Sequence, residues 1–232
     1  MAHHIGIVGC SAEGASLCYR TICAEGARQL GPHAHPEVTV HTPSFAEYVA
    51  CCDRDDRQGI ADLMLASAHK LAAAGADFLI CPDNTIHSAF DLVEPHSPLP
   101  WLHIAAVVAD EALRRGFRCI GLTGTRWLVD SSVYPDQLVP RGLAFERPTE
   151  PERQEIHRII MDELVAGVFT AGQVATFQEI IRGLAARGCD AVALGCTEIP
   201  LIINDGNSPL PTLDSTRLLA RAALRRAIDG EA

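Results

Sequence analysis

The sequence lacks the long apolar run, the basic cluster and the cysteine spacing that mark several common classes of protein. No apolar run approaches the roughly 18 residues of a transmembrane helix, and the N-terminal residues show no signal-peptide pattern. Basic residues are few, since 19 Lys and Arg stand against 29 Asp and Glu and give a formal net charge of −10. This charge disfavours nucleic acid and anionic membranes as partners.

The nine cysteines are scattered and odd in number, and none of them form a C-x-x-C motif. This pattern argues against a disulfide framework, and a cytoplasmic location is expected because thiols persist in that reducing compartment. The His and Cys residues show no metal-ligand spacing. The run from Gly6 to Gly9 lacks the full dinucleotide-binding fingerprint. Neither a metal nor NAD is therefore expected.

Two stretches of the chain, residues 71–85 and 184–198, are versions of each other. Each contains the end of a helix, a Gly, an Asp, an apolar strand and a polar loop. The loop residues Asp83 and Cys196 each lie eight positions after the Gly of their own stretch. The chain thus contains the same strand-and-loop segment twice, with the carboxyl group of Asp83 in one loop and the thiol of Cys196 in the other.

Short apolar strands alternate with helical patterns along all 232 residues, and the 48% apolar content is enough for a sizeable core. The expected strands are residues 5–9, 38–42, 78–81, 101–105, 119–124 and 191–194, and the expected helices are 15–30, 56–74, 86–93, 152–168, 173–186 and 215–228. Gly6 lies 77 residues before Asp83, and Gly121 lies 75 residues before Cys196, which indicates an internal duplication.

This alternation predicts an α/β fold of two pseudosymmetric lobes, each a parallel sheet flanked by helices. Residues 1–105 plus 213–232 are expected to form the N-terminal lobe, and residues 106–212 the C-terminal lobe. In open parallel sheets the ligand crevice lies beyond the carboxyl ends of the strands. A pseudo-twofold relation would therefore place Asp83 and Cys196 on opposite walls of one cleft between the lobes.

Two acid/base groups that face each other suit proton transfer at a carbon, with inversion of its configuration. With ordinary pKa values near ~3.9 for a carboxyl and ~8.5 for a thiol, Asp83 is the base and Cys196 the acid at neutral pH. The residues that follow, Asn84, Thr85, Thr197 and Glu198, begin helices. Backbone N–H groups there can hold a substrate carboxylate and stabilise an enediolate-like transition state.

Five motifs point to one family. They are Ile5-Gly-Ile-Val-Gly9, Asn84-Thr85-Ile-His87, Leu102-His103-Ile-Ala105, Gly124-Thr125-Arg126 and Leu194-Gly195-Cys196-Thr197-Glu198-Ile199-Pro200-Leu201. Over essentially its full length the chain resembles the aspartate/glutamate racemase family. The resemblance implies a homodimer that acts on an amino acid without pyridoxal phosphate or another cofactor. It also implies two acid/base residues on either side of the substrate α-carbon.

Cys196 falls on the family's second catalytic position, and Asp83 stands at the first, where the family usually has Cys and sometimes Thr. The expected substrate contacts are Cys10, Ser11, Cys52, Asn84, Thr85, Thr125, Thr197 and Glu198. Cys10-Ser11-Ala12-Glu13 lacks the aromatic residue that close relatives have before the Glu. Cys51-Cys52 occupies the region where relatives often have a polar or cationic group for the distal carboxylate, so the sequence does not identify the side chain of the substrate.

The leading hypothesis is a cofactor-independent amino-acid racemase or epimerase that uses Asp83 and Cys196. One alternative is a superfamily decarboxylase or cis–trans isomerase that acts on a small dicarboxylate, with Cys196 as proton donor or nucleophile. Another is a non-catalytic binder of a small carboxylate. Asp83 is also typical of an Asx turn or a helix cap before Asn84.

Overall fold

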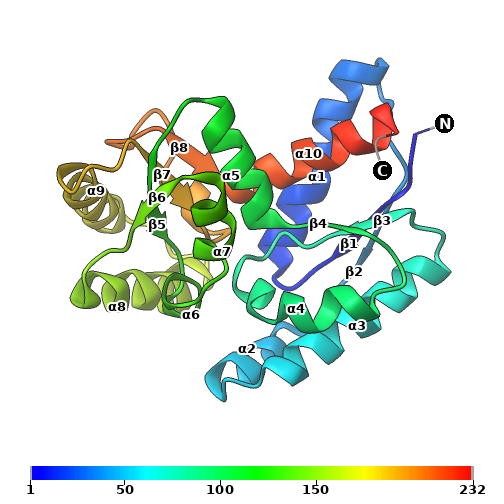
Figure 1. The fold of residues 1–232 in the computed structure, drawn as a ribbon, viewed down its shortest axis with the longest axis horizontal. Coiled ribbons are helices and arrows are strands. Elements are labelled where there is room, and N and C mark those ends of the chain that lie inside the picture. Colours follow the sequence, from blue (N-terminus) through cyan, green and yellow to red (C-terminus); the bar gives the residue numbers. More distant parts are fainter. Residues whose placement is uncertain (1, 231–232) are drawn as a thin grey trace. The chain divides into compact units, whose positions relative to one another are not determined.

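A computed structural model describes residues 2–230, and the chain divides into two compact units. Unit 1 comprises residues 1–107 and 216–232, and unit 2 comprises residues 108–215. Each unit contains a four-stranded parallel sheet with helices packed on it (Figure 1). The α/β fold class that the sequence predicts, with two parallel sheets flanked by helices, is confirmed.

In unit 1 the strands follow the order β2-β1-β3-β4. These are β1 (Ile5–Val8), β2 (Val38–His41), β3 (Phe78–Ile80) and β4 (Trp101–Leu102). The helices are α1 (Ala12–Leu30), α2 (Phe45–Asp53), α3 (Arg57–Ala73), the short η1 (Thr85–Ala89), α4 (Phe90–Val93), η2 (Glu94–His96), the first residues of α5 (Ile104–Arg114) and nearly all of α10 (Ser215–Asp229).

The central strands β1 and β3 of this sheet are buried on both faces, which explains their nearly continuous apolar sequences. On one face Ile7 and Ile80 pack with residues of α1 and α10, which lie side by side in Figure 1. On the other face Val8 and Leu79 pack against α3, through Met64 among others, and against α4. The carboxyl ends of β1 and β3 are thereby held next to each other.

In unit 2 the strands follow the order β6-β5-β7-β8. These are β5 (Cys119–Thr123), β6 (Ala144–Glu146), β7 (Ala191–Leu194) and β8 (Thr212–Asp214). The helices are most of α5, then α6 (Arg126–Asp130), α7 (Pro135–Leu138), η3 (Val139–Arg141), α8 (Glu150–Arg158), the π-helical η4 (Ile159–Leu164), α9 (Ala171–Ala186) and η5 (Ile199–Leu201). One core packs Phe177 and Leu184 of α9 against Val192 and Leu194 of β7.

The two sheets have the same topology. If the strands of each unit are numbered in chain order, both sheets have the spatial order second, first, third, fourth. β3 and β7 are therefore equivalent strands, and Asp83 and Cys196 follow them within three residues. The duplication that the sequence spacing indicates is present in the strand order.

Several elements differ from the sequence expectation. Residues 45–53 form α2, a helix for which the sequence analysis gave no prediction, and its Tyr48 and Cys51 side chains are buried. The strand expected over 101–105 ends at Leu102, and α5 begins at Ile104. The cause is His103, whose Nδ1 accepts hydrogen bonds from the backbone N–H groups of Ala105 (3.2 Å) and Ala106 (3.4 Å) and so caps the new helix. Within residues 2–230 no helix is both long and apolar enough to span a membrane.

Candidate active site

Asp83 lies in the loop beyond β3, with its side chain half-buried. Its Oδ1 accepts a hydrogen bond from the backbone N–H of Ile86 at 3.2 Å. Its carbonyl oxygen accepts another from Nδ1 of His87 at 2.6 Å. The carboxylate thus caps η1, as the Asx-turn alternative supposes, and it also keeps part of its surface exposed. One residue can serve both purposes, since one oxygen suffices for the cap.

Three thiols lie near Asp83. Cys10 is 4% exposed and its thiol forms a side-chain hydrogen bond with Asp83, while Cys81 is fully buried and Cys52 half-buried. Burial, and next the negative charge of Asp83, raise the pKa of Cys10 and of Cys81 well above the usual range. The same two causes raise the pKa of Cys52 to about 12. At neutral pH these three thiols therefore keep their protons.

The other predicted contacts of unit 1 lie in the same loops. Ser11 is the N-cap of α1, and its Oγ accepts from the backbone N–H of Gly14 at 3.1 Å. Asn84 is 2% exposed, and Thr85, half-buried, opens η1. The structure therefore gathers all the predicted residues of this unit at the carboxyl edge of its sheet, except Cys52, which reaches Asp83 from α2.

His87 holds the Asp83 loop through a hydrogen bond to its backbone. The ring is 3% exposed, and because a carbonyl oxygen can only accept, Nδ1 carries the proton of its bond to Asp83. His87 Nε2 has no hydrogen-bond partner among the described residues. Burial, and next the neighbouring His103, lower the pKa of His87 well below its usual value, so the ring is neutral. It packs against Phe90 and His103 at centroid distances of 5.5 and 4.6 Å.

In unit 2, Cys196 lies in the loop beyond β7 and is half-buried. Its Sγ donates to Oε2 of Glu198 at 2.9 Å, and the hydroxyl of Thr197 donates to the same oxygen at 2.8 Å. Glu198 is 5% exposed and Thr197 3%. A buried carboxylate needs such donors, because burying it without hydrogen bonds is costly. The structure therefore brings Cys196, Thr197 and Glu198 together in one hydrogen-bonded group.

Gly195 sets the path of the chain into this group. A Cβ at this position would lie 2.6 Å from the carbonyl oxygen of Thr123 and 2.5 Å from Cδ2 of Leu128. Thr123 ends β5, which pairs with β7, so the close approach is imposed by the sheet. Thr125, 5% exposed, caps α6 by accepting from the backbone N–H of Leu128 at 3.3 Å. The loops that carry Thr125 and Cys196 are thereby adjacent.

The family model for Asp/Glu/hydantoin racemases matches residues 5–223 of the chain. The chain belongs to this family. A candidate Asp/Glu racemase from Yersinia pestis has a solved structure that is 30% identical, with a TM-score of 0.89 over 97% of this chain and 99% of that one. An aspartate racemase homologue from Pyrococcus horikoshii OT3 is 29% identical, with a TM-score of 0.82 over 97% and 99%.

A curated relative is the broad specificity amino-acid racemase RacX of Bacillus subtilis (strain 168). It is 22% identical over 172 residues, which are 73% of each chain. The resemblance found in the sequence is thus confirmed, and these relatives support a racemase, an isomerase, as the function of this family member. Within the described part of the chain, no group of three or more His, Cys, Asp and Glu residues is arranged to hold a metal ion.

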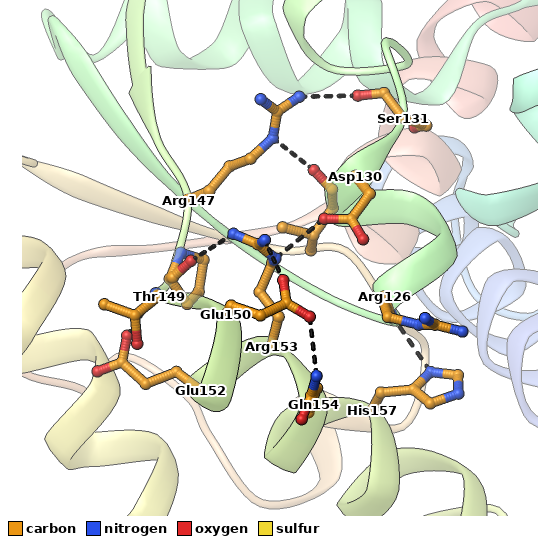
Figure 2. A network of polar contacts seen from close by, with 12 residues as sticks. Arg126, Asp130, Ser131, Arg147, Thr149, Glu150, Glu152, Arg153, Gln154 and His157 are labelled. Atoms are coloured by element: carbon orange, nitrogen blue, oxygen red, sulfur yellow. Dashed lines mark hydrogen bonds and ion pairs between the residues drawn. The ribbon is translucent and has the colours of Figure 1, made fainter.

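A polar network in unit 2 of this racemase-family chain fixes the segment after Thr125 (Figure 2). The Arg147 guanidinium donates to the carbonyl oxygens of Val129 (2.6 Å) and Ser131 (3.0 Å), at the end of α6. Nε of Arg153 lies 2.9 Å from Oδ1 of Asp130. Both arginines thus bind the last turn of a helix only five residues long, which is too short to be stable by itself.

The start of α6 is held from α8. Nδ1 of His157 accepts a hydrogen bond from the backbone N–H of Arg126 at 3.3 Å (Figure 2). The His157 ring also meets Trp127 edge-on at a centroid distance of 4.7 Å. Helix α6 is thus held at both ends, and this fixes the position of Thr125, its N-cap, at the carboxyl edge of the sheet.

Proposed function

We propose that this chain is a cofactor-independent amino-acid racemase or epimerase in which Asp83 and Cys196 exchange the substrate α-proton from opposite faces of the carbon. The observation that carries the proposal is the equivalence of the two residues. Each follows the equivalent strand of its own sheet, and each has a half-buried side chain that can titrate. A duplicated edge with two different proton-transfer groups suits a reaction that adds and removes a proton at one carbon.

In one direction the Asp83 carboxylate removes the α-proton, and the Cys196 thiol delivers its own proton to the other face. The product has the opposite configuration, Asp83 is protonated and Cys196 is a thiolate. In the reverse direction the thiolate removes the proton and the Asp83 carboxyl delivers one. Glu198 holds the sulfur of Cys196 in place, because its carboxylate accepts a hydrogen bond from that thiol, and this bond breaks when the thiol turns its proton toward the substrate carbon. The pair therefore needs no resident cofactor to turn over.

We propose that the backbone N–H groups after the two strands bind the substrate carboxylate. The short helices η1 and η5 begin beside Asp83 and Cys196, and backbone N–H groups at the start of a helix favour an anion. Thr85 and Cys52 are half-buried and are the proposed side-chain contacts. The buried residues Cys10, Ser11, Asn84, Thr125, Thr197 and Glu198 are proposed to shape the site through their loops or through the catalytic pair.

The substrate is proposed to be an amino acid whose side chain is uncharged. Cys52, with a pKa of about 12, is a neutral group and offers no positive charge to a distal carboxylate. The name of the Bacillus subtilis relative, which describes a broad specificity, supports testing many amino acids. We further propose a cytoplasmic homodimer, with all nine cysteines as free thiols, as the structure has them.

Hydrogen exchange in heavy water tests the proposal. The protein is incubated with D- and L-amino acids, and loss of the α-proton signal is followed by NMR together with the configuration of the product. Wash-in with inversion is the expected result. Consumption of a small dicarboxylate, with no amino acid exchanging, would instead identify a decarboxylase or isomerase of such acids. Saturable binding without turnover would identify a binder.

Variants of the pair sharpen this test. Asp83→Asn and Cys196→Ser should each lower racemisation by at least ~10²-fold, the usual contribution of a general acid or base. Cys23→Ser, which changes another half-buried thiol in α1, is the matched control and should keep full activity. Racemase activity retained in Asp83→Asn would remove that residue from the mechanism.

A further inference from the structure

The buried thiol of Cys10 lies next to the side chain of Asp83. β1 and β3 are neighbours in the sheet, with Ile7 opposite Ile80, so the loops that follow them meet. Cys10 is 4% exposed, and its thiol shares a side-chain hydrogen bond with the half-buried Asp83. An ionised carboxylate can only accept, so the thiol is the donor.

Unit 2 contains the same kind of pair with its order reversed. There the thiol of Cys196 is half-buried, and the carboxylate of Glu198, 5% exposed, stands behind it with an S···O distance of 2.9 Å. In each unit the half-buried residue, Asp83 or Cys196, is a proposed proton-transfer group. The buried residue beside it is a thiol where the first is a carboxylate, and a carboxylate where the first is a thiol. The same pair occurs in both units, with the places of the thiol and the carboxylate exchanged. We infer from this that Cys10 and Glu198, the buried residues of the two pairs, contribute to function and do not only fill space.

We propose that Cys10 is a positioning residue for Asp83, whose thiol donates to the carboxylate, orients it and favours its ionised form. This inference rests on the proposed function of Asp83. Ile86 N–H already fixes Oδ1 at 3.2 Å. A second donor, from the thiol, restricts rotation of the carboxylate and keeps a lone pair directed at the substrate carbon.

A cysteine suits this task because it remains a donor at every working pH. Burial, then the charge of Asp83, raise the pKa of Cys10 well above the usual range, so the thiol keeps its proton. Its charge stays zero, and it adds no negative charge to the site. Hydrogen bonds to the charged form of an acid favour that form. Loss of the thiol should therefore make Asp83 a weaker base at acidic pH because more of it is protonated.

Three variants test the inference: Cys10→Ala removes the donor, Cys10→Ser restores a donor, and Cys18→Ala removes another fully buried sulfur of unit 1. The first readout is the pH profile of α-proton exchange in heavy water. We expect the acidic limb of Cys10→Ala to move to higher pH, with about a tenfold loss of rate on that limb. Cys10→Ser should return the limb to its wild-type place, and Cys18→Ala should not move it.

The second readout needs no activity. In protein with ¹³C-labelled aspartate, the carboxyl carbon of Asp83 is assigned by comparison with Asp83→Asn and titrated by NMR. The midpoint should rise in Cys10→Ala and return in Cys10→Ser. Equal midpoints and equal pH profiles in wild type and Cys10→Ala would overturn the inference while the proposed function stands. If wild type exchanges no amino acid, the proposed function fails, and the titration alone decides whether Cys10 acts on Asp83.

Discussion

One carboxylate oxygen of Glu198 lies 2.9 Å from the sulfur of Cys196. The carboxylate is buried, and the same oxygen also receives the hydroxyl of Thr197 at 2.8 Å. Glu198 is therefore turned toward the thiol, although the sequence offered it as a contact of the substrate. A residue that positions Cys196 affects kcat, whereas a residue that only binds the substrate affects KM.

Glu198→Gln keeps the size of the side chain and removes its charge. If Glu198 positions Cys196, kcat should fall by about tenfold or more and KM should stay near the wild-type value, since only the position of the thiol changes. Steady-state racemisation followed by circular dichroism measures both constants. A raised KM with unchanged kcat would contradict this and return Glu198 to substrate binding. Glu179→Gln, an exposed carboxylate on α9, is the control.

His87 should make unit 1 sensitive to acid. Burial lowers the pKa of His87 in the folded protein well below the reference value of 6.5, so below about pH 6.5 the unfolded chain binds a proton that the folded chain does not. Stability is thus fully present above that pH and falls as the pH drops, by up to about 1.4 kcal/mol per unit. His87→Asn keeps a donor near the Nδ1 position without titrating, and should flatten this slope in urea unfolding between pH 7.5 and 5.5.

The control for that slope is His69→Asn, because His69 is exposed on α3 and meets water in both the folded and the unfolded chain. Its slope should match that of the wild type. An unchanged slope in His87→Asn would show that the buried imidazole does not govern the acid sensitivity.

Arg147 should matter more for stability than an exposed arginine. Arg147→Ala leaves the carbonyl oxygens of Val129 and Ser131 without these donors, at a cost of about 1–3 kcal/mol. Arg182 pairs only on the surface of α9, with 56% of its side chain exposed, and Arg182→Ala should cost less than about 1 kcal/mol. Chemical denaturation of both variants checks the difference. Equal losses would mean that the network of Figure 2 does not hold the end of α6.

Two glycines of unit 2 should respond to alanine in opposite ways. Gly195→Ala forces a Cβ to within 2.6 Å of the Thr123 carbonyl oxygen, and overpacking of this kind costs about 1–3 kcal/mol. It should also move Cys196 and reduce racemisation. Gly172→Ala on α9 meets nothing closer than 3.8 Å and should stabilise by about 0.5–1 kcal/mol. Thermal unfolding with activity assays on the same samples tests both, and a stable, fully active Gly195→Ala would contradict the account.

The local pattern of the sequence was sufficient for most of the fold. Buried strands such as residues 191–194 are apolar on both faces, and amphipathic helices have a different period, so both could be predicted. The equal spacing of Asp83 and Cys196 from their glycines predicted the duplicated edge. The edge strand β6 escaped prediction, because its three half-exposed or exposed residues carry little apolar signal.

The sequence by itself determined the residue types at the two strand ends and the repeat that makes them equivalent. It could not decide which buried side chain contacts Asp83 and which contacts Cys196. That Cys10 lies beside Asp83 follows from the pairing of β1 with β3, and that His103 starts α5 follows from a capped turn. Glu198 follows Cys196 by two positions, yet only the fold of the loop turns it back to the sulfur. The contact of Cys10 joins segments far apart in the chain, and the other two depend on the conformation of a loop, so the tertiary structure decides which groups are buried and which hydrogen bonds form.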